Sequence, residues 1–205
     1  MTDEPHPVDL AHDLRGWFYR AVAPGAGSAV LEVGDARLGN WFDDVTRTDL
    51  AQADASSAHG GHFDVVVMHQ SLGGCPTLLG ALAAAGRALR QGGWLILSGA
   101  NRLRPASHEA APSTDTPRAT GWGYRSALAR AGFGNVALYV AHPPDVAPIY
   151  VIDAHPRSAR AFFSAELTAR NLPIWSARRL VLAALVATNL MPYLQPGFIV
   201  VGRKC

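Results

Sequence analysis

The sequence predicts an α/β fold built on a mostly parallel sheet, and three observations support this prediction. Residues 63–68 form an apolar, β-branched run typical of a strand, residues 76–90 have the pattern of a helix, and residues 94–98 form a second apolar run. A connection that contains a helix joins parallel strands. A further apolar run at 29–34 ends in glycine, as expected of a buried strand that enters a tight turn. The length of 205 residues suits one domain spanning 1–205.

Composition and charge narrow the class of protein. Hydrophobic residues make up 49% of the chain and charged residues 17%, which excludes a disordered chain. The formal net charge of +2 comes without a basic stripe, so no nucleic-acid partner is expected. The two cysteines, Cys75 and Cys205, favour a reducing, cytoplasmic setting. We expect no signal peptide at 1–12, because these residues do not contain a basic segment followed by an apolar one. We also expect no membrane-spanning helix, because no apolar run is long enough.

The other elements follow from periodicity and from glycine and proline positions. Apolar residues near one face predict a helix over 9–22, and Pro24-Gly25 then breaks it. Residues 99–120, rich in Ala, Pro, Ser and Thr, are predicted to form a loop past the end of a strand. Further along, we expect a helix at 124–131, strands at 136–140 and 149–153, helices at 156–170 and 176–190, and a last strand at 197–202.

The predicted helix 176–190 is apolar on nearly every face, and Arg178-Arg179 stand at its start. Such a helix needs to be covered. It could pack on the core as a lid, bind a partner protein or a second copy through 176–194, or contact a membrane surface. The sequence ranks the membrane contact last.

Four segments of the predicted core carry motifs in a definite order: VLEVG at 30–34, FDVVV at 63–67, RALRQGGWL at 87–95 and LARAGF at 128–133. The set resembles the class I S-adenosylmethionine (SAM)-dependent methyltransferases. The resemblance implies a Rossmann-like three-layer α/β sandwich. Its parts would be an N-terminal helix and linker at 9–28, a core at 29–141, a helical insertion at 142–196 and a last strand at 197–205.

The same resemblance implies SAM as cofactor, bound beyond the carboxyl end of the first strand. Asp49, at the end of a predicted strand 45–49, would bond the ribose hydroxyls, and the residues after the fourth strand would face the adenine or the methyl group. His69 is also the candidate general base for a hydroxyl substrate, although a polar strand cap or an adenine contact is favoured. The implied cofactor-binding residues are Glu32, Gly34, Asp35, Ala36, Asp49, His69, Gln70 and Ser71.

The chain departs from the family in its glycine-rich loop and in its length. Ala36 and Leu38 replace two glycines, and only 28 residues separate Gly34 from Phe63, so the fold is predicted to be shortened between strands 1 and 4. Two hypotheses stay open: methyl transfer to a small or lipid-like metabolite, or an inactive methyltransferase-fold accessory subunit that docks a partner protein. A nucleotide-binding oxidoreductase is weaker, since no G-x-G-x-x-G follows the first strand.

Three residues near the long loop are candidates for a substrate pocket: His108, Trp122 and Tyr124. For His108 a solvated loop is the alternative, and for the two aromatic residues the alternative is burial against the sheet. No metal site is predicted, because His59 and His62 have no cysteine or acidic partner at a suitable spacing.

Overall fold

A computed structural model of the protein describes residues 18, 29–34, 42, 44–50, 52, 61–103, 116–142, 150–169 and 176–205. The elements are β1 (Ala29–Gly34), β2 (Asp44–Arg47), β3 (Phe63–His69), α3 (Leu78–Ala88), β4 (Leu89–Asn101), β5 (Arg118–Ala119), α4 (Gly121–Arg130), β6 (Phe133–His142), β7 (Tyr150–Asp153), α5 (Pro156–Ala169), α6 (Ala177–Ala187), the 3-10 helix η2 (Met191–Leu194) and β8 (Gly197–Lys204). Apart from Phe18, the predicted helix 9–22 lies outside the described residues.

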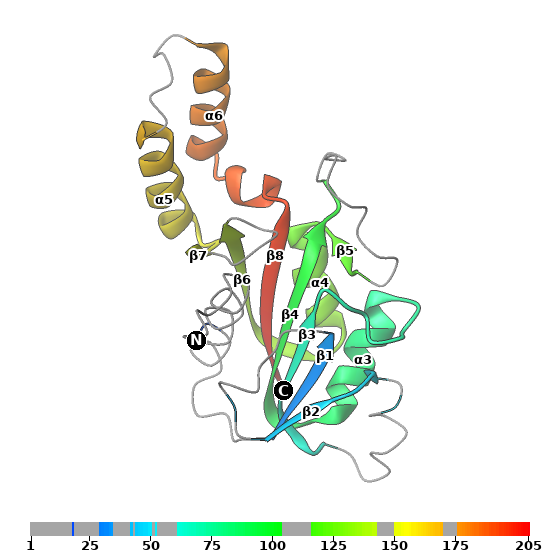
Figure 1. Ribbon diagram of the computed structural model, residues 1–205. Coiled ribbons are helices and arrows are strands. Elements are labelled where there is room, and N and C mark those ends of the chain that lie inside the picture. The colour runs from blue at the N-terminus through cyan, green and yellow to red at the C-terminus, as the bar shows by residue number, and fades with distance from the viewer. Residues whose placement is uncertain are drawn as a thin grey trace, which may run out of the picture.

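The strands form one sheet in the order β2-β1-β3-β4-β8-β6-β7, and β5 pairs with β4 (Figure 1). β1 pairs in parallel with β2 and β3, and β3 pairs in parallel with β4. β8 runs antiparallel to both β4 and β6, and β7 runs antiparallel to β6. β5 is parallel to β4, and β6 runs in the same direction as β4 because both are antiparallel to β8. Six of the eight strands thus run in one direction, which confirms the prediction of a mostly parallel sheet in an α/β fold.

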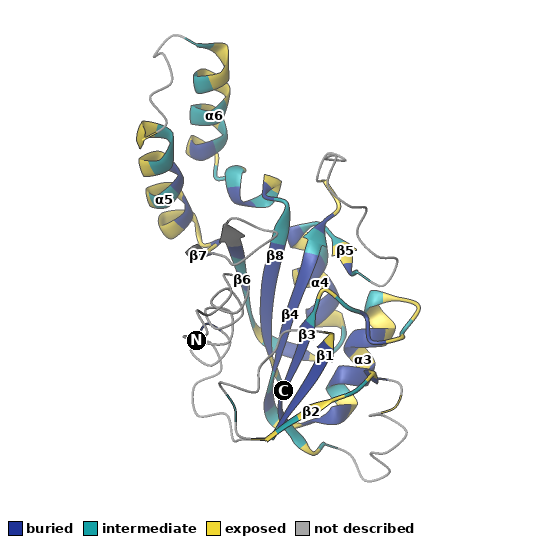
Figure 2. Ribbon diagram, in the orientation of Figure 1, coloured by how far each residue is buried: buried dark blue, intermediate teal, exposed yellow. Residues whose placement is uncertain are grey.

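Both faces of the central strands are covered. Along β3, Val65 and Val67 belong to one apolar cluster, whereas Val66 and Met68 belong to another cluster on the opposite face. Successive side chains of a strand point to opposite faces, so an uninterrupted apolar run marks a strand buried on both sides. Helices α3 and α4, which Figure 2 shows as buried in part, contribute to the larger cluster. Phe18 contributes to the smaller one.

The shortening between the first two predicted core strands is visible at the edge of the sheet. β2 is the last described strand on that side, and three of its four residues are exposed. Only Leu50 and Gln52 are helical among the residues described between β2 and β3. The chain thus reaches β3 without a further described strand at this edge.

Several predicted boundaries differ from the structure: the strand predicted at 45–49 is β2 at 44–47, and the strand predicted at 136–140 is β6 at 133–142. Two further differences have a visible cause. The strand predicted at 94–98 is longer, because β4 runs from Leu89 to Asn101 and takes in both Gly92-Gly93 and the start of the predicted loop. The helix predicted at 124–131 begins at Gly121, because the Thr120 side chain accepts a hydrogen bond from the Gly123 N–H and caps the first turn. The middle of the predicted loop, 104–115, lies outside the described residues.

The insertion predicted at 142–196 contains β7, which pairs with β6 in the sheet, and the helices α5, α6 and η2, here called the arm, which lie between β7 and β8. Figure 1 shows that α5 and α6 extend beyond the end of the sheet. The Asn101 side chain, at the carboxyl end of β4, anchors the arm, because its amide donates hydrogen bonds of 2.7 Å to both the Tyr193 and Gln195 carbonyl oxygens. The interpretation of 176–190 as a core helix is wrong, since α6 is mostly exposed or half-buried (Figure 2) and Val186 is its single buried residue.

Candidate functional site

The carboxyl ends of β1 and β3 meet where the strand order of the sheet reverses. From β1 the chain passes to β2 on one side, whereas β3 lies on the other side, and Gly34 pairs in register with His69. Ligands of open parallel sheets bind at such a switch point, outside the carboxyl ends of the strands. This edge is therefore the candidate site.

Gly34 ends β1 in a conformation that other residues rarely adopt. Its φ is +87°, and a Cβ at this position would overlap the carbonyl oxygen of His69. The same Cβ would lie 3.3 Å from the Cβ of Ser71. Glycine is required here both for the backbone angle and for the close approach of two chain segments. The result is a tight turn in which Gly34 is exposed while the end of β3 fills the space that a side chain would take.

A small hydrogen-bond network holds the end of β3. The Ser98 hydroxyl lies 3.0 Å from Nδ1 of His69. The Gln70 N–H donates to both the Ser98 hydroxyl and the Ser98 carbonyl oxygen, each at 3.1 Å. Gln70 takes a positive φ of 49°, which turns the chain away from the strand. The next residue, Ser71, accepts a hydrogen bond from the Gly73 N–H at 3.0 Å.

Sequence reasoning missed Ser98 as a site residue. It ends the third predicted strand and is the register partner of His69 on β4, where it is 7% exposed. The sequence did contain a signal for it, because a polar residue at the carboxyl end of a buried parallel strand is a candidate for ligand binding. Through its bond to the imidazole, Ser98 orients the His69 ring at the rim of the candidate site.

The predicted residues on β1 and β2 lie in two different environments. Glu32 is 1% exposed, and its Oε2 accepts a hydrogen bond from Nε of Arg47 at 3.0 Å across the β1–β2 pair. The arginine compensates the charge of the buried carboxylate. Asp49 is exposed two residues beyond the end of β2, and its carbonyl oxygen accepts a bond from the Gln52 N–H at 3.1 Å. The Asp49 carboxylate is thus the more accessible of the two.

The two predicted aromatic residues of the substrate pocket also differ. Trp122 is 51% exposed and stacks on Tyr193 of the arm, with ring centroids 4.1 Å apart. Tyr124 is fully buried, and its hydroxyl lies 2.9 Å from the Ala100 carbonyl oxygen and 2.7 Å from that of Pro117. Burial raises the pKa of Tyr124 well above its usual range. Its environment fits the alternative of burial against the sheet.

Three of the predicted site residues, Asp35, Ala36 and His108, lie outside the described residues. Within the described part of the chain, no group of three or more His, Cys, Asp or Glu side chains is arranged to hold a metal ion. None of the helices in that same part is both long and apolar enough to cross a membrane.

The side chains gathered at this edge suit the polar groups of SAM. Asp49 offers a carboxylate, His69 an imidazole and Gln70 an amide, which together can accept and donate hydrogen bonds to ribose hydroxyls and to a purine. Gly34 is exposed at the end of β1, beside these side chains, and it carries no side chain that would cover the turn. The described residues therefore fit the cofactor that the resemblance implies.

Comparison with solved structures shows that the chain has the fold of the class I SAM-dependent methyltransferases. A SAM-dependent methyltransferase of Thermotoga maritima, described as a possible histamine N-methyltransferase, matches with a TM-score of 0.54 and 13% identity, covering 96% of this chain and 92% of that one. No protein-family model and no curated protein matches the sequence.

Two further structures show the same fold. Phosphoethanolamine N-methyltransferase 2 of Haemonchus contortus, in complex with phosphomonomethylethanolamine and S-adenosylhomocysteine, matches with a TM-score of 0.54 and 10% identity over 94% of this chain and 53% of that chain. A putative methyltransferase of Haloferax volcanii, in complex with the Trm112 activator, matches with a TM-score of 0.52 and 17% identity over 94% and 89%.

Proposed function

We propose that this chain binds SAM at the β1–β3 edge and transfers its methyl group to a small or lipid-like molecule. The turn at Gly34 is the observation that carries the proposal, because this exposed glycine brings the ends of β1 and β3 into close contact at the switch point. The fold supports the cofactor, and the solved neighbour from Haemonchus contortus, a phosphoethanolamine methyltransferase, supports a small acceptor.

Each residue of the site has a proposed role. Asp49 binds the ribose hydroxyls, Gln70 and Ser71 contact the adenine, and Gly34 provides the close backbone approach. SAM supplies an electrophilic methyl group when bound. His69, oriented by Ser98 at 3.0 Å, accepts the proton that a hydroxyl acceptor loses. Most of the rate acceleration then comes from positioning, so no strong acid–base pair is needed.

The experiment is isothermal titration of the whole chain with SAM and S-adenosylhomocysteine. The wild-type protein should bind in the micromolar range. Asp49→Ala should weaken binding by about 10- to 100-fold, as expected for the loss of hydrogen bonds to a charged group. Asp44→Ala is the matched control, because Asp44 is also exposed but stands at the opposite end of β2. Its affinity should equal that of the wild type.

Two outcomes would count against the proposal. Absence of both heat and a shift in melting temperature at millimolar ligand would exclude autonomous cofactor binding. Equal weakening by Asp44→Ala and Asp49→Ala would remove Asp49 from the site.

A second function is a methyltransferase-fold accessory protein that no longer methylates and docks a partner protein. The bond between Arg47 and Glu32 favours it, because it engages the buried Glu32 carboxylate, which the resemblance assigns to the cofactor. The open edge at β2 favours it as well. A silent titration with SAM would favour this function, and co-purification with one defined protein would then support it.

A further inference from the structure

The outward side of α6 is an apolar stripe that the described chain leaves uncovered. Ala177, Leu180, Val181 and Ala184, here called the outer stripe, are all exposed, and their spacing of three and four residues places them on one side of the helix. Leu180 is 56% exposed and Val181 is 59% exposed. The opposite side of α6 packs against α5 through Leu182 and Val186, around a cavity of about 50 Å³.

The arm also carries the positive charge of the protein. Its described residues include the four arginines 157, 160, 178 and 179 and one acidic residue, Glu166, which gives the arm a formal charge of +3. The formal charge of the whole chain is +2. The arm is therefore basic, and the rest of the chain is slightly acidic.

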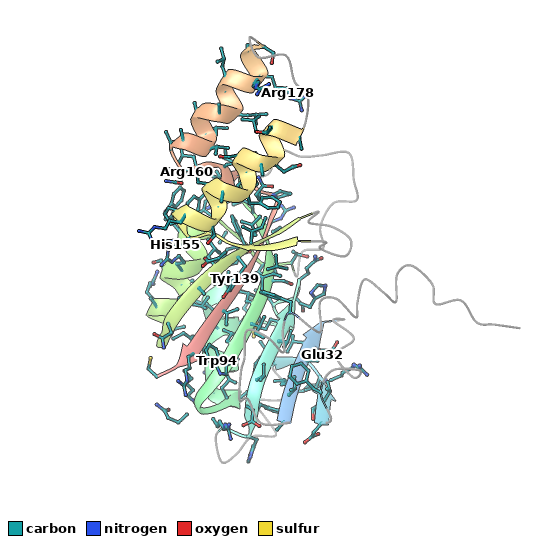
Figure 3. The ribbon with its side chains drawn as sticks, turned by 90° about the vertical axis from the view of Figure 1, so that its left-hand side faces the viewer. Glu32, Trp94, Tyr139, His155, Arg160 and Arg178 are labelled. Atoms are coloured by element: carbon teal, nitrogen blue, oxygen red, sulfur yellow. The ribbon has the colours of Figure 1, made fainter. Side chains whose placement is uncertain are left out.

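Arg178 is the arginine of the arm that lies next to the outer stripe. It is exposed at the start of α6, and Figure 3 shows it at the end of the arm farthest from the sheet. At 100° per residue it lies beside Val181, on the flank of the outer stripe. Nearer the sheet, Arg160 donates a hydrogen bond of 3.1 Å to the Ala187 carbonyl oxygen. The far end of the arm thus presents apolar side chains with a flanking cation.

The area of the outer stripe distinguishes between a protein and a lipid surface as its partner. With a rise of 1.5 Å per residue and a width of about 10 Å, one face of an 11-residue helix has a footprint of roughly 160 Å². Each partner in a stable protein complex contributes about 800 Å². Shallow insertion into a lipid surface needs only a few apolar side chains together with basic residues that anionic headgroups attract.

We propose that α6 docks this protein on an anionic lipid surface. The outer stripe enters the boundary between headgroups and acyl chains, and Arg178 binds the headgroup phosphates. The proposal goes beyond methyl transfer and does not depend on SAM, because the surface lies on the arm and not at the β1–β3 edge.

The experiment is co-sedimentation of the whole chain with vesicles in the absence of SAM. One set of vesicles contains phosphatidylcholine alone, and the other contains equal parts of phosphatidylcholine and phosphatidylglycerol. The protein should sediment with the anionic vesicles only, and added salt should release it. Arg178→Gln should weaken the partition about fivefold. The double variant Leu180→Ser, Val181→Ser should weaken it by roughly 30-fold.

Matched controls separate docking from general effects of substitution. Leu79→Ser removes an exposed leucine of α3, and Arg125→Gln removes an exposed arginine of α4. Both should sediment as the wild type does. Because the replaced side chains of the double variant are already more than half exposed, its circular dichroism and melting temperature should match those of the wild type.

Three results would overturn the proposal. The first is no sedimentation with anionic vesicles. The second is sedimentation that the double variant leaves unchanged. The third is a dimer in size-exclusion chromatography with light scattering that the double variant dissociates, which would assign the outer stripe to a second copy of the chain. None of these results depends on whether the chain binds SAM, so this test and the titration fail independently.

Discussion

The substitution Gly34→Ala tests whether the end of β1 is shaped by close contact. Two costs add at this position. An L side chain at φ +87° costs about 1–2 kcal/mol, and forcing a methyl group against the His69 carbonyl costs about 1–3 kcal/mol more. Gly132 is a nearly ideal control, since its φ is +86° and a Cβ there would meet nothing within 4 Å. Gly132→Ala therefore carries the first cost alone.

Urea unfolding followed by circular dichroism measures both variants against the wild type. Gly132→Ala should lower the free energy of unfolding by about 1–2 kcal/mol, and Gly34→Ala by about 2–5 kcal/mol. The difference between them isolates the contact with His69. Equal destabilisation of the two variants would refute the reasoning. It would show that the chain near His69 shifts to accommodate the methyl group, and that glycine is needed at position 34 for its backbone angle alone.

Two further predictions concern buried polar groups. Tyr124→Phe should cost about 1–3 kcal/mol at neutral pH, because it removes the donor to the Ala100 and Pro117 carbonyls. Burial holds the folded-state pKa of Tyr124 above its unfolded value of about 10. Wild-type stability is therefore complete below pH 10 and falls as the pH rises above it. Chemical denaturation at neutral and alkaline pH should show that the free energy of unfolding falls less with rising pH in the variant than in the wild type. Burial also raises the pKa of Tyr139, so the variant keeps part of the fall. An identical fall in both proteins would be inconsistent with this assignment. Asn101→Ala should lower the free energy of unfolding by about 3 kcal/mol, since it leaves the Tyr193 and Gln195 carbonyls and the Leu103 N–H without their donor and acceptor. Urea unfolding measures it, and a loss below about 1 kcal/mol would show that Asn101 does not hold the arm.

The local pattern predicted the strands well where both faces are buried. The apolar runs at 29–34 and 63–68 became β1 and β3 within one residue. The prediction from local pattern was wrong at 89–93. Gln91-Gly92-Gly93 is typical of the end of a helix, but these residues belong to β4. In the structure, Arg203 and Lys204 of β8 donate to the Gly92 and Leu89 carbonyls and draw this segment into β4. Such bonds join residues more than a hundred positions apart, so no short window of sequence contains them.

The candidate site was predicted in part. Gly34, His69, Gln70 and Ser71 could be named because each stands at the carboxyl end of a predicted parallel strand. Ser98 could not be assigned to His69 without knowing that β3 and β4 are neighbours in this register. The sequence also could not predict that Trp122 is exposed whereas Tyr124 is buried, because both lie on α4. The packing of η2 and of the end of β4 against this helix decides which ring is exposed.

The sequence by itself determined the elements, the turn that requires glycine, and the order typical of the methyltransferase fold. These depend on the spacing of apolar residues and on the conformational freedom of single residues, which are local properties. Only the tertiary structure decided which strands adjoin, which polar groups meet at their ends, and that one apolar face of α6 points outward. Periodicity shows which residues share a face, but whether that face is covered depends on how distant segments pack.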